Sequence, residues 1–225
     1  IRWAFTDPIA IGDRSAASGN GLFQTTGWGL NTERVSLYNN SSATPVWEFS
    51  TNPSVNINYV AISDTGGVIA AGSYHNIYMF NRTSSTPFFN FNLEIQLPDT
   101  GVAGPVDITG NGRFLVATAS RSDSSWIFGF WRDSANPVWR LRVGQTGAGG
   151  ASIYGVKLSG NDSLVIVNTY GGFYVLRTYT GQLLFQGLIN PSSPNSGTQF
   201  PQGISGDGSI IATVNYSGNL RVYQW

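Results

Sequence analysis

The chain has 225 residues, of which 41% are hydrophobic and 13% aromatic, while only 11% are charged, against about a quarter in a typical soluble protein. Its 12 basic and 12 acidic residues cancel, and no basic run could follow a phosphate backbone, so the composition excludes nucleic acid as an expected partner. There is no cysteine, which excludes disulfides, thiolate metal sites and a cysteine nucleophile.

Hydropathy and composition also bear on where the protein resides. No run of about 18 apolar residues is present, so we expect no segment that inserts into a membrane. No signal peptide precedes Ile1, and the simplest interpretation is a mature or excised portion of a longer product. Ser, Thr, Asn, Gln and Gly supply the polar surface in place of charges, which favours an extracellular or cell-surface protein.

A short polar turn recurs at intervals of about 45 to 50 residues, which is the spacing of a repeat protein. Asn-Gly and Asp-Gly pairs are strong hairpin signals, because a type I′ turn needs positive φ at its central residues. We therefore predict a β-hairpin at each copy. The five copies are Ser18-Gly19-Asn20-Gly21, Ser63-Asp64-Thr65-Gly66, Thr109-Gly110-Asn111-Gly112, Ser159-Gly160-Asn161-Asp162 and Ser205-Gly206-Asp207-Gly208.

Each turn is followed by an apolar strand, a second turn and an alternating strand. Four strands in a unit of this length is typical of a β-propeller blade, and no window shows the apolar spacing of a helix. A β-sandwich is the structural alternative, but it would not explain five matched units. The first four units end in an aromatic strand, at Val46–Phe49, Phe88–Phe91, Val138–Leu141 and Leu184–Gln186.

The fifth unit stops at Trp225 before its aromatic strand, and Arg2-Trp3-Ala4-Phe5 at the other end matches Val46-Trp47-Glu48-Phe49. Closing the ring with this strand would remove free sheet edges. We therefore predict an all-β, five-bladed β-propeller of four-stranded antiparallel blades, in which the N-terminal strand completes the last blade. Residues 1–225 form one domain, with blades at about 12–50, 56–93, 103–143, 152–189, and 200–225 together with 1–6.

Several segments carry a recognisable repeat pattern, namely Val60–Gly67, Ala70–Ser73, Ser85–Phe89 and Tyr179–Phe185. They resemble the repeats of WD-repeat-like and pyrroloquinoline-quinone-like propellers from prokaryotic, particularly archaeal, cell-surface proteins. The resemblance implies the blade architecture and says little about activity. The Trp-Asp and Gly-His pairs of WD repeats are absent, and so is the acidic metal site of quinone enzymes. We expect no cofactor and no metal.

The residue two positions before each polar turn should face the central channel, and only one of the five is a carboxylate, Asp107. Asp107 and Lys157 lie on adjacent predicted blades, where they can form an ion pair that closes the channel. A glycosidase needs two facing carboxylates. The single histidine, His75, lies in a turn and has no G-x-S-x-G elbow beside it, so we expect no catalytic residue.

The second turn of each blade carries an aromatic residue at nearly the same offset. Flat aromatic faces with nearby amides suit the apolar face of a sugar, or a peptide. The alternative is that these rings pack against the adjacent loop and only seal the blades. The candidate ligand-binding residues are Trp28, Tyr74, Tyr170 and Tyr216, with Arg121 in the third blade.

Five Asn-x-Ser/Thr tripeptides fall in predicted turns, which is the placement that N-glycosylation requires in an exported protein. Such tripeptides also arise by chance in a chain rich in Asn, Ser and Thr. The candidate asparagines are Asn39, Asn40, Asn81, Asn161 and Asn215.

Three functions fit these patterns. The first is a non-enzymatic extracellular module that acts as a scaffold, an adhesin, or a filament or coat subunit through contacts with protein partners or with other copies of itself. The second is a lectin-like propeller, which the repeated aromatics favour and which makes glycans a further candidate partner. The third is a glycan-active hydrolase or lyase, which would need a second carboxylate near Asp107. The missing acid–base groups favour the first.

Overall fold

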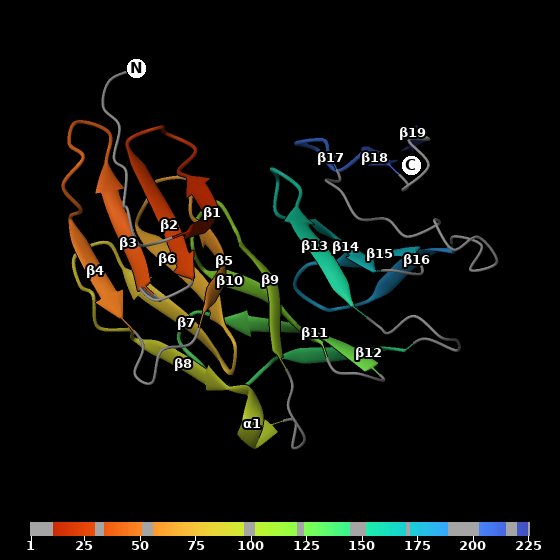
Figure 1. Ribbon diagram of the computed structural model, residues 1–225. Helices are drawn as coiled ribbons and strands as arrows, with labels where there is room; N and C mark the ends of the chain where they lie inside the picture. The colour runs from red at the N-terminus through yellow and green to blue at the C-terminus, as the bar shows by residue number, and fades with distance from the viewer. Residues whose placement is uncertain are drawn as a thin grey trace.

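The computed structural model describes residues 11–29, 34–50, 56–96, 102–120, 124–144, 152–169, 172–188, 203–214 and 220–224. These residues form five antiparallel sheets that follow one another around a common centre, from blade 1 in red to blade 5 in blue (Figure 1). Neighbouring strands within each sheet are consecutive in the chain. The protein is therefore an all-β, five-bladed propeller.

The strands of the first three blades are consecutive along residues 11–144. Blade 1 comprises β1 (Ile11–Ala17), β2 (Phe23–Gly29), β3 (Arg34–Asn39) and β4 (Trp47–Ser50). Blade 2 comprises β5 (Ile57–Ile62), β6 (Val68–Ser73), β7 (Asn76–Asn81) and β8 (Phe89–Asn92). Blade 3 comprises β9 (Val102–Ile108), β10 (Phe114–Ser120), β11 (Ser124–Trp131) and β12 (Trp139–Gly144).

The last two blades differ in their number of described strands. Blade 4 comprises β13 (Ile153–Leu158), β14 (Leu164–Thr169), β15 (Gly172–Arg177) and β16 (Leu183–Leu188). Blade 5 comprises β17 (Gly203–Ile204), β18 (Ile210–Val214) and β19 (Leu220–Gln224). A single helical turn, α1 (Leu93–Gln96), follows blade 2. In the described part of the chain, no helix is long and apolar enough to cross a bilayer.

The polar turn between the first two strands is built the same way in every blade. In blade 1 the Gly21 amide donates to the Ser18 carbonyl (2.8 Å), and the Phe23 amide donates to Ser18 Oγ (3.0 Å). Within these four-residue turns, positive φ occurs only at the fourth residue, as at Gly21 (φ 67°) and Asp162 (φ 58°). The expected type I′ geometry is therefore wrong, because that turn needs positive φ at both central residues. Instead, the chain reverses through a turn in which the fourth residue alone is left-handed.

These turns are also bonded to one another from blade to blade. Because each copy has the same shape, a backbone amide of each turn meets an acceptor of the next turn, and this links blades 1 to 5 in sequence. The acceptor is a backbone carbonyl in three links and the Asp162 carboxylate in the link from blade 3 to blade 4. We call the side of the ring that these turns and the third-to-fourth-strand turns occupy the turn face. The linking bonds are Asn20 N–H to Asp64 O (2.9 Å), Asp64 N–H to Gly110 O (2.9 Å), Gly110 N–H to Asp162 Oδ1 (3.0 Å) and Asn161 N–H to Gly206 O (2.7 Å).

The fourth-strand aromatics pack between blades, which explains why they recur in the sequence. Trp47 lies against Phe80 of the next blade, with ring centroids 5.3 Å apart, and its Nε1–H donates to the Arg82 carbonyl (2.8 Å). Trp139 repeats this bond to the Thr178 carbonyl (3.0 Å). The buried apolar residues accordingly form clusters between consecutive blades, and burial of that area is the main stabilising contribution.

Blade 5 shows three strands among the described residues, and no described strand pairs with the outer edge of β19. Leu220 and Val222 of β19 are 64% and 61% exposed. The predicted closing strand at residues 1–6 lies outside the described residues, so closure by that strand stays a prediction.

Candidate functional site

Asp107 and Lys157 form an ion pair between blades 3 and 4, with Oδ2 3.3 Å from Nζ. The same carboxylate accepts hydrogen bonds from two backbone amides, Ile108 N–H at Oδ1 (3.0 Å) and Leu158 N–H at Oδ2 (2.9 Å). Oδ2 therefore joins β9 to β13, while Oδ1 is used within β9 itself. That use suits a structural carboxylate better than a proton donor that must reach a substrate.

Burial raises the pKa of Asp107, and the Lys157 charge and the two amide bonds act against that rise. A second carboxylate, Asp162, lies on the adjacent blade. Burial also raises the pKa of Asp162, the Gly110 amide that donates to it lowers it, and the charges of Asp64 and Asp107 raise it again. Both Asp107 and Asp162 are thus bonded to backbone amides. No group of His, Asp or Glu side chains in the described residues could hold a metal ion.

The aromatics of the second turns differ in exposure. Trp28 is only 9% exposed, and the Arg34 guanidinium lies 5.0 Å from its ring centroid, so this ring is covered. Tyr74 is exposed and packs edge-on against His75 (4.5 Å), whose Nδ1 is 3.3 Å from Glu94 of α1. Arg121, Tyr170 and Tyr216 lie outside the described residues. Exposure of the side chains at these three positions stays a prediction, whereas the covered Trp28 cannot offer an open ring face.

The candidate asparagines differ in how their amide nitrogens are used. Asn161 Nδ2 donates to the Asp207 carbonyl (2.9 Å), and Asn40 Nδ2 donates to the Gly21 carbonyl (3.0 Å). Asn39 and Asn81 instead accept at Oδ1, from Ser41 and Arg132. Asn215 lies outside the described residues.

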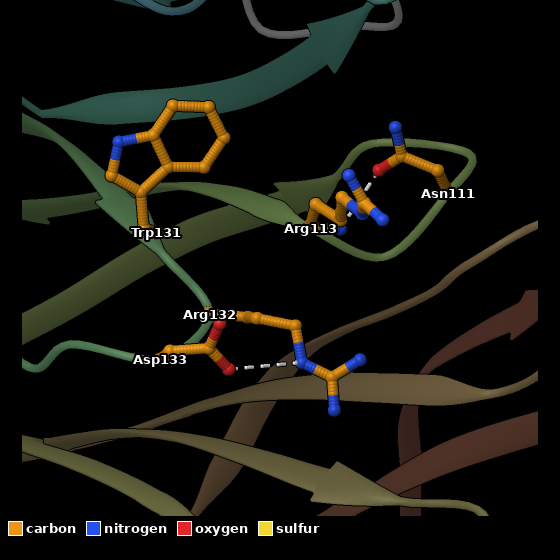
Figure 2. Close-up of a pocket in the computed structure, with 5 residues that line it drawn as sticks. All are labelled: Asn111, Arg113, Trp131, Arg132 and Asp133. Atoms are coloured by element: carbon orange, nitrogen blue, oxygen red, sulfur yellow. Dashed lines mark hydrogen bonds and ion pairs between the residues drawn. The ribbon is translucent and has the colours of Figure 1, made fainter.

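A pocket of about 440 Å³ opens on the turn face of blade 3, and Figure 2 shows its residues standing around one opening. The strand register creates it. Phe114 pairs with Trp131 across β10 and β11, and the Arg132 amide then donates to the Arg113 carbonyl (2.9 Å). Arg113 and Arg132 therefore stand opposite each other at the end of the sheet. The lining residues are Asn111, Arg113, Trp131, Arg132 and Asp133.

The two arginines of the pocket have different surroundings. Arg132 is held by Asp133 (Nε to Oδ1, 3.5 Å), by Asn81 (Nη2 to Oδ1, 3.2 Å) and by the Phe88 ring beneath its guanidinium (5.2 Å). Arg113 has a fixed backbone, because its amide donates to the Asn111 side chain (2.8 Å). Its guanidinium makes no hydrogen bond or ion pair within the part of the chain that the structure describes.

An exposed aromatic pair borders the same pocket. Trp131 stacks on Tyr179 of blade 4 with centroids 5.6 Å apart and planes 14° from parallel. Both rings also pack edge-on against buried Phe114, which fixes their position. Trp131 remains 44% exposed and Tyr179 37% exposed. We call Arg113, Trp131, Arg132, Asp133 and Tyr179 the blade 3–4 site.

Blade 3 departs from the other blades at this site. The register places Asn39, Asn81, Arg177 and Gln224 where blade 3 has Trp131. The position of Arg113 holds Leu22, Gly67 and Ser163 in blades 1, 2 and 4. Blades 1, 2 and 4 therefore form without Trp at the first of these positions and without Arg at the second. Residues that recur from unit to unit do not mark this site, because Trp131 and Arg113 are exceptions to the repeat. An alignment of the five units at these positions reveals the exception.

No known family profile matches the sequence, and no curated protein matches it closely enough to count as a relative. Solved structures do match the fold. The β-propeller domain of Myceliophteria thermophila Cps50 (Swd1) superposes with a TM-score of 0.64 at 10% identity, covering 96% of this chain and 66% of that one.

A chain in the crystal structure of a mitotic checkpoint complex gives the same TM-score of 0.64 at 14% identity, covering 98% of this chain and 79% of that one. This chain thus spans slightly less than two thirds of the Cps50 chain. At such low identity the likeness shows a WD-repeat-like β-propeller fold.

Proposed function

We propose that the protein is a non-enzymatic propeller module that binds protein partners on its turn face, with the blade 3–4 site as the anchor of that contact. We further propose that it acts outside the cell, as a scaffold, an adhesin, or a filament or coat subunit. The partners are other proteins or other copies of this chain.

The stacked pair of Trp131 and Tyr179 is the observation that carries this proposal. Trp, Tyr and Arg dominate the residues whose truncation weakens protein complexes most, and the blade 3–4 site combines all three. The partly exposed Phe88 beneath Arg132 extends the apolar surface onto blade 2. Since a stable interface covers about 800 Å² on each partner, we expect the contact to reach beyond the pocket over the neighbouring turns.

The hydrogen bonds of Asp107 and Asp162 support a non-enzymatic role. An acid–base pair for glycoside hydrolysis needs one carboxylate that protonates the leaving group and a second that attacks or activates water. Asp107 has both oxygens bonded to backbone amides and Lys157. Asp162 is bonded to Gly110. These bonds favour strand pairing over proton transfer to a substrate.

The extracellular part of the proposal rests on low charge and on sequons that begin at the last residue of a strand and continue into a turn, such as those at Asn39 and Asn81. It is tested by fractionating cells of the organism that encodes the chain and detecting the protein in each fraction. Recovery from the cytosol alone would contradict it.

The binding function is tested with displayed polypeptide fragments from the same organism, panned on the immobilised full chain. Individual binders are then titrated against wild type, Trp131→Ala and a control, Leu220→Ala, which truncates an exposed apolar residue at the end of blade 5 opposite to the turn face. We expect Trp131→Ala to weaken binding by about 30-fold, as at an interface hot spot, and Leu220→Ala to change it little.

An oligosaccharide array is run in parallel with the same variants. The proposed function is wrong if no polypeptide binder depends on Trp131, or if oligosaccharides bind through Trp131 while polypeptides do not. Circular dichroism of each variant shows whether the propeller remains folded.

A further inference from the structure

We infer that the blade 3–4 site binds an acidic peptide segment, in which a carboxylate side chain pairs with Arg113 and a neighbouring aromatic or leucine side chain packs on Trp131 and Tyr179. The inference rests on the proposed function and adds the chemistry of the partner.

The charge of the site determines the sign of the ligand. Arg132 already faces a carboxylate, that of Asp133. Arg113 stands across the pocket from that pair (Figure 2) and is exposed, with no partner for its guanidinium among the described residues. The pocket therefore has one positive charge in excess. A guanidinium presents two parallel N–H groups that match a carboxylate, so an anionic group completes the site.

The apolar half of the site lies directly beside this charge. Trp131 is the last residue of β11 and pairs with Phe114, the first residue of β10. Arg113 directly precedes Phe114, so the ring and the guanidinium belong to neighbouring positions at the same end of the sheet. Tyr179 supports the ring from blade 4. A ligand that fills both halves must carry an apolar side chain within a few residues of its acid. Two side chains of this kind on one extended or turned segment meet that requirement.

A peptide fits this arrangement better than a neutral sugar. Sugar hydroxyls are usually held by polar groups that both accept and donate hydrogen bonds. The carboxylate that lines the pocket, Asp133, is engaged with Arg132, and Asn111 Oδ1 already accepts from Thr109 Oγ1 and the Arg113 amide. Arg113 carries the pocket charge that no described carboxylate neutralises, and a guanidinium can only donate hydrogen bonds.

The test uses an array of synthetic twelve-residue peptides and the full-length chain. Each peptide contains one Asp or Glu, or the matched Asn or Gln, at one to four residues from a Trp, Phe or Leu. The best acidic peptide is then titrated in solution against wild type, Arg113→Gln and Trp131→Ala. We expect acidic peptides to bind, and each of Arg113→Gln and the peptide's Asp→Asn change to weaken binding about tenfold or more, as for a charge-assisted hydrogen bond.

The double substitution separates direct pairing from a general charge effect. If Arg113 pairs with the peptide acid, Arg113→Gln combined with the neutral peptide should cost little more than either change alone. The control is Arg82→Gln, which removes the same charge from the turn face of blade 2, where Arg82 lies over Phe23. This control should leave binding unchanged.

Three other outcomes would overturn the inference, and one of them would overturn the proposed function as well. Peptide binding that depends on Trp131 but not on Arg113 or on the acid would overturn this inference and leave the proposed function standing. Binding of anionic oligosaccharides through Trp131 and Arg113, with no peptide bound, would overturn both. If wild type binds acidic and neutral peptides equally, the inference is also overturned. This comparison uses the wild-type protein alone, so it does not depend on how well the variants fold.

Discussion

The Asp107 carboxylate joins two blades, because its Oδ2 accepts a hydrogen bond from the Leu158 amide of the next inner strand (2.9 Å). Lys157, the residue before Leu158, approaches the same oxygen to 3.3 Å. The sheets of blades 3 and 4 are separate, so the Leu158 amide of β13 bonds to the buried Asp107 side chain of β9 in place of a backbone carbonyl. The Lys157 side chain is 59% exposed, so Lys157 and the two backbone amides together stabilise the negative charge of Asp107.

The ion pair predicts a pH-dependent effect of Lys157→Met. Removing the cation should raise the pKa of buried Asp107 further, because Lys157 is the largest influence that opposes its desolvation. A carboxylate whose pKa is higher in the folded protein than in the unfolded chain binds its proton more tightly in the folded state. The free energy of unfolding therefore falls as the pH rises from the unfolded-state pKa through the folded-state pKa. The variant should therefore lose about 1 kcal/mol near neutral pH.

That loss should shrink as the pH falls below the raised pKa, since a protonated Asp107 needs no cation. Urea unfolding at neutral pH and at about pH 4, near the carboxyl range, measures both values. Arg177→Met is the control, because it removes a surface cation bonded to neutral Gln182. A Lys157→Met effect that is equal at the two pH values would contradict the role given to the pair.

Much of the fold was predictable because a propeller repeats its physical requirements. Each blade needs a polar turn with one left-handed residue, as at Gly21, and each blade interface needs a large ring, as at Trp47. Both leave marks at a fixed spacing in the sequence. The turn type was not predictable from the Asn-Gly pair alone, because Asn20 accepts from Ser18 Oγ (2.8 Å) and the strand register then makes Gly21 the residue with positive φ.

The candidate site was predicted less well, for a related reason. Residues that recur in every blade are those that the fold requires. Trp28 occupies the same position in its blade as Tyr74, yet its ring is covered by Arg34. Trp131 and Arg113 are exceptions to the repeat, and their proximity depends on the pairing of β10 with β11. The stacking of Trp131 on Tyr179 further requires the neighbouring blade, which no spacing within one unit could show.

Two glycines with nearly equal φ should respond differently to alanine. Gly21 (φ +67°) has open space where a Cβ would lie, whereas a Cβ on Gly181 (φ +66°) would lie 2.5–2.7 Å from three indole atoms of Trp139. Gly21→Ala should cost about 1 kcal/mol for the left-handed backbone. Gly181→Ala should cost about 3 kcal/mol, because the collision with the inter-blade Trp adds to that strain. Denaturant unfolding of both variants measures the difference, and equal losses would show that Trp139 yields freely.

The hydrogen bonds of the asparagines predict which sequons are modified when the chain is secreted from a glycosylating host. Asn161 Nδ2 bonds blade 4 to blade 5 at Asp207, and Asn40 Nδ2 bonds the polar turn of its own blade at Gly21. A glycan on either nitrogen would compete with these bonds. Asn39 and Asn81 use Oδ1 instead, so we expect glycans on these two. Glycopeptide mass spectrometry of the folded, secreted protein checks this, and full occupancy at Asn161 would contradict it.

Closure of the ring by the N-terminal strand is testable by comparing Trp3 with Trp47. Trp47 packs on Phe80 and donates to the Arg82 carbonyl, so Trp47→Ala should cost about 3 kcal/mol. If residues 1–6 complete blade 5, Trp3 makes the equivalent contact with β3 of blade 1, and Trp3→Ala should cost a similar amount. Deleting residues 1–6 should cost several kcal/mol, through lost aromatic burial and a free sheet edge.

Hydrogen exchange identifies where that loss occurs. β19 has exposed Leu220 and Val222, and a strand from residues 1–6 would protect its outer amides. Deletion of residues 1–6 should therefore speed exchange along Leu220–Gln224, whereas Trp47→Ala should destabilise the protein without singling out that strand. If the deletion leaves both the unfolding free energy and the exchange of β19 unchanged, residues 1–6 do not close the ring, and the fourth strand of blade 5 must come from elsewhere or be absent.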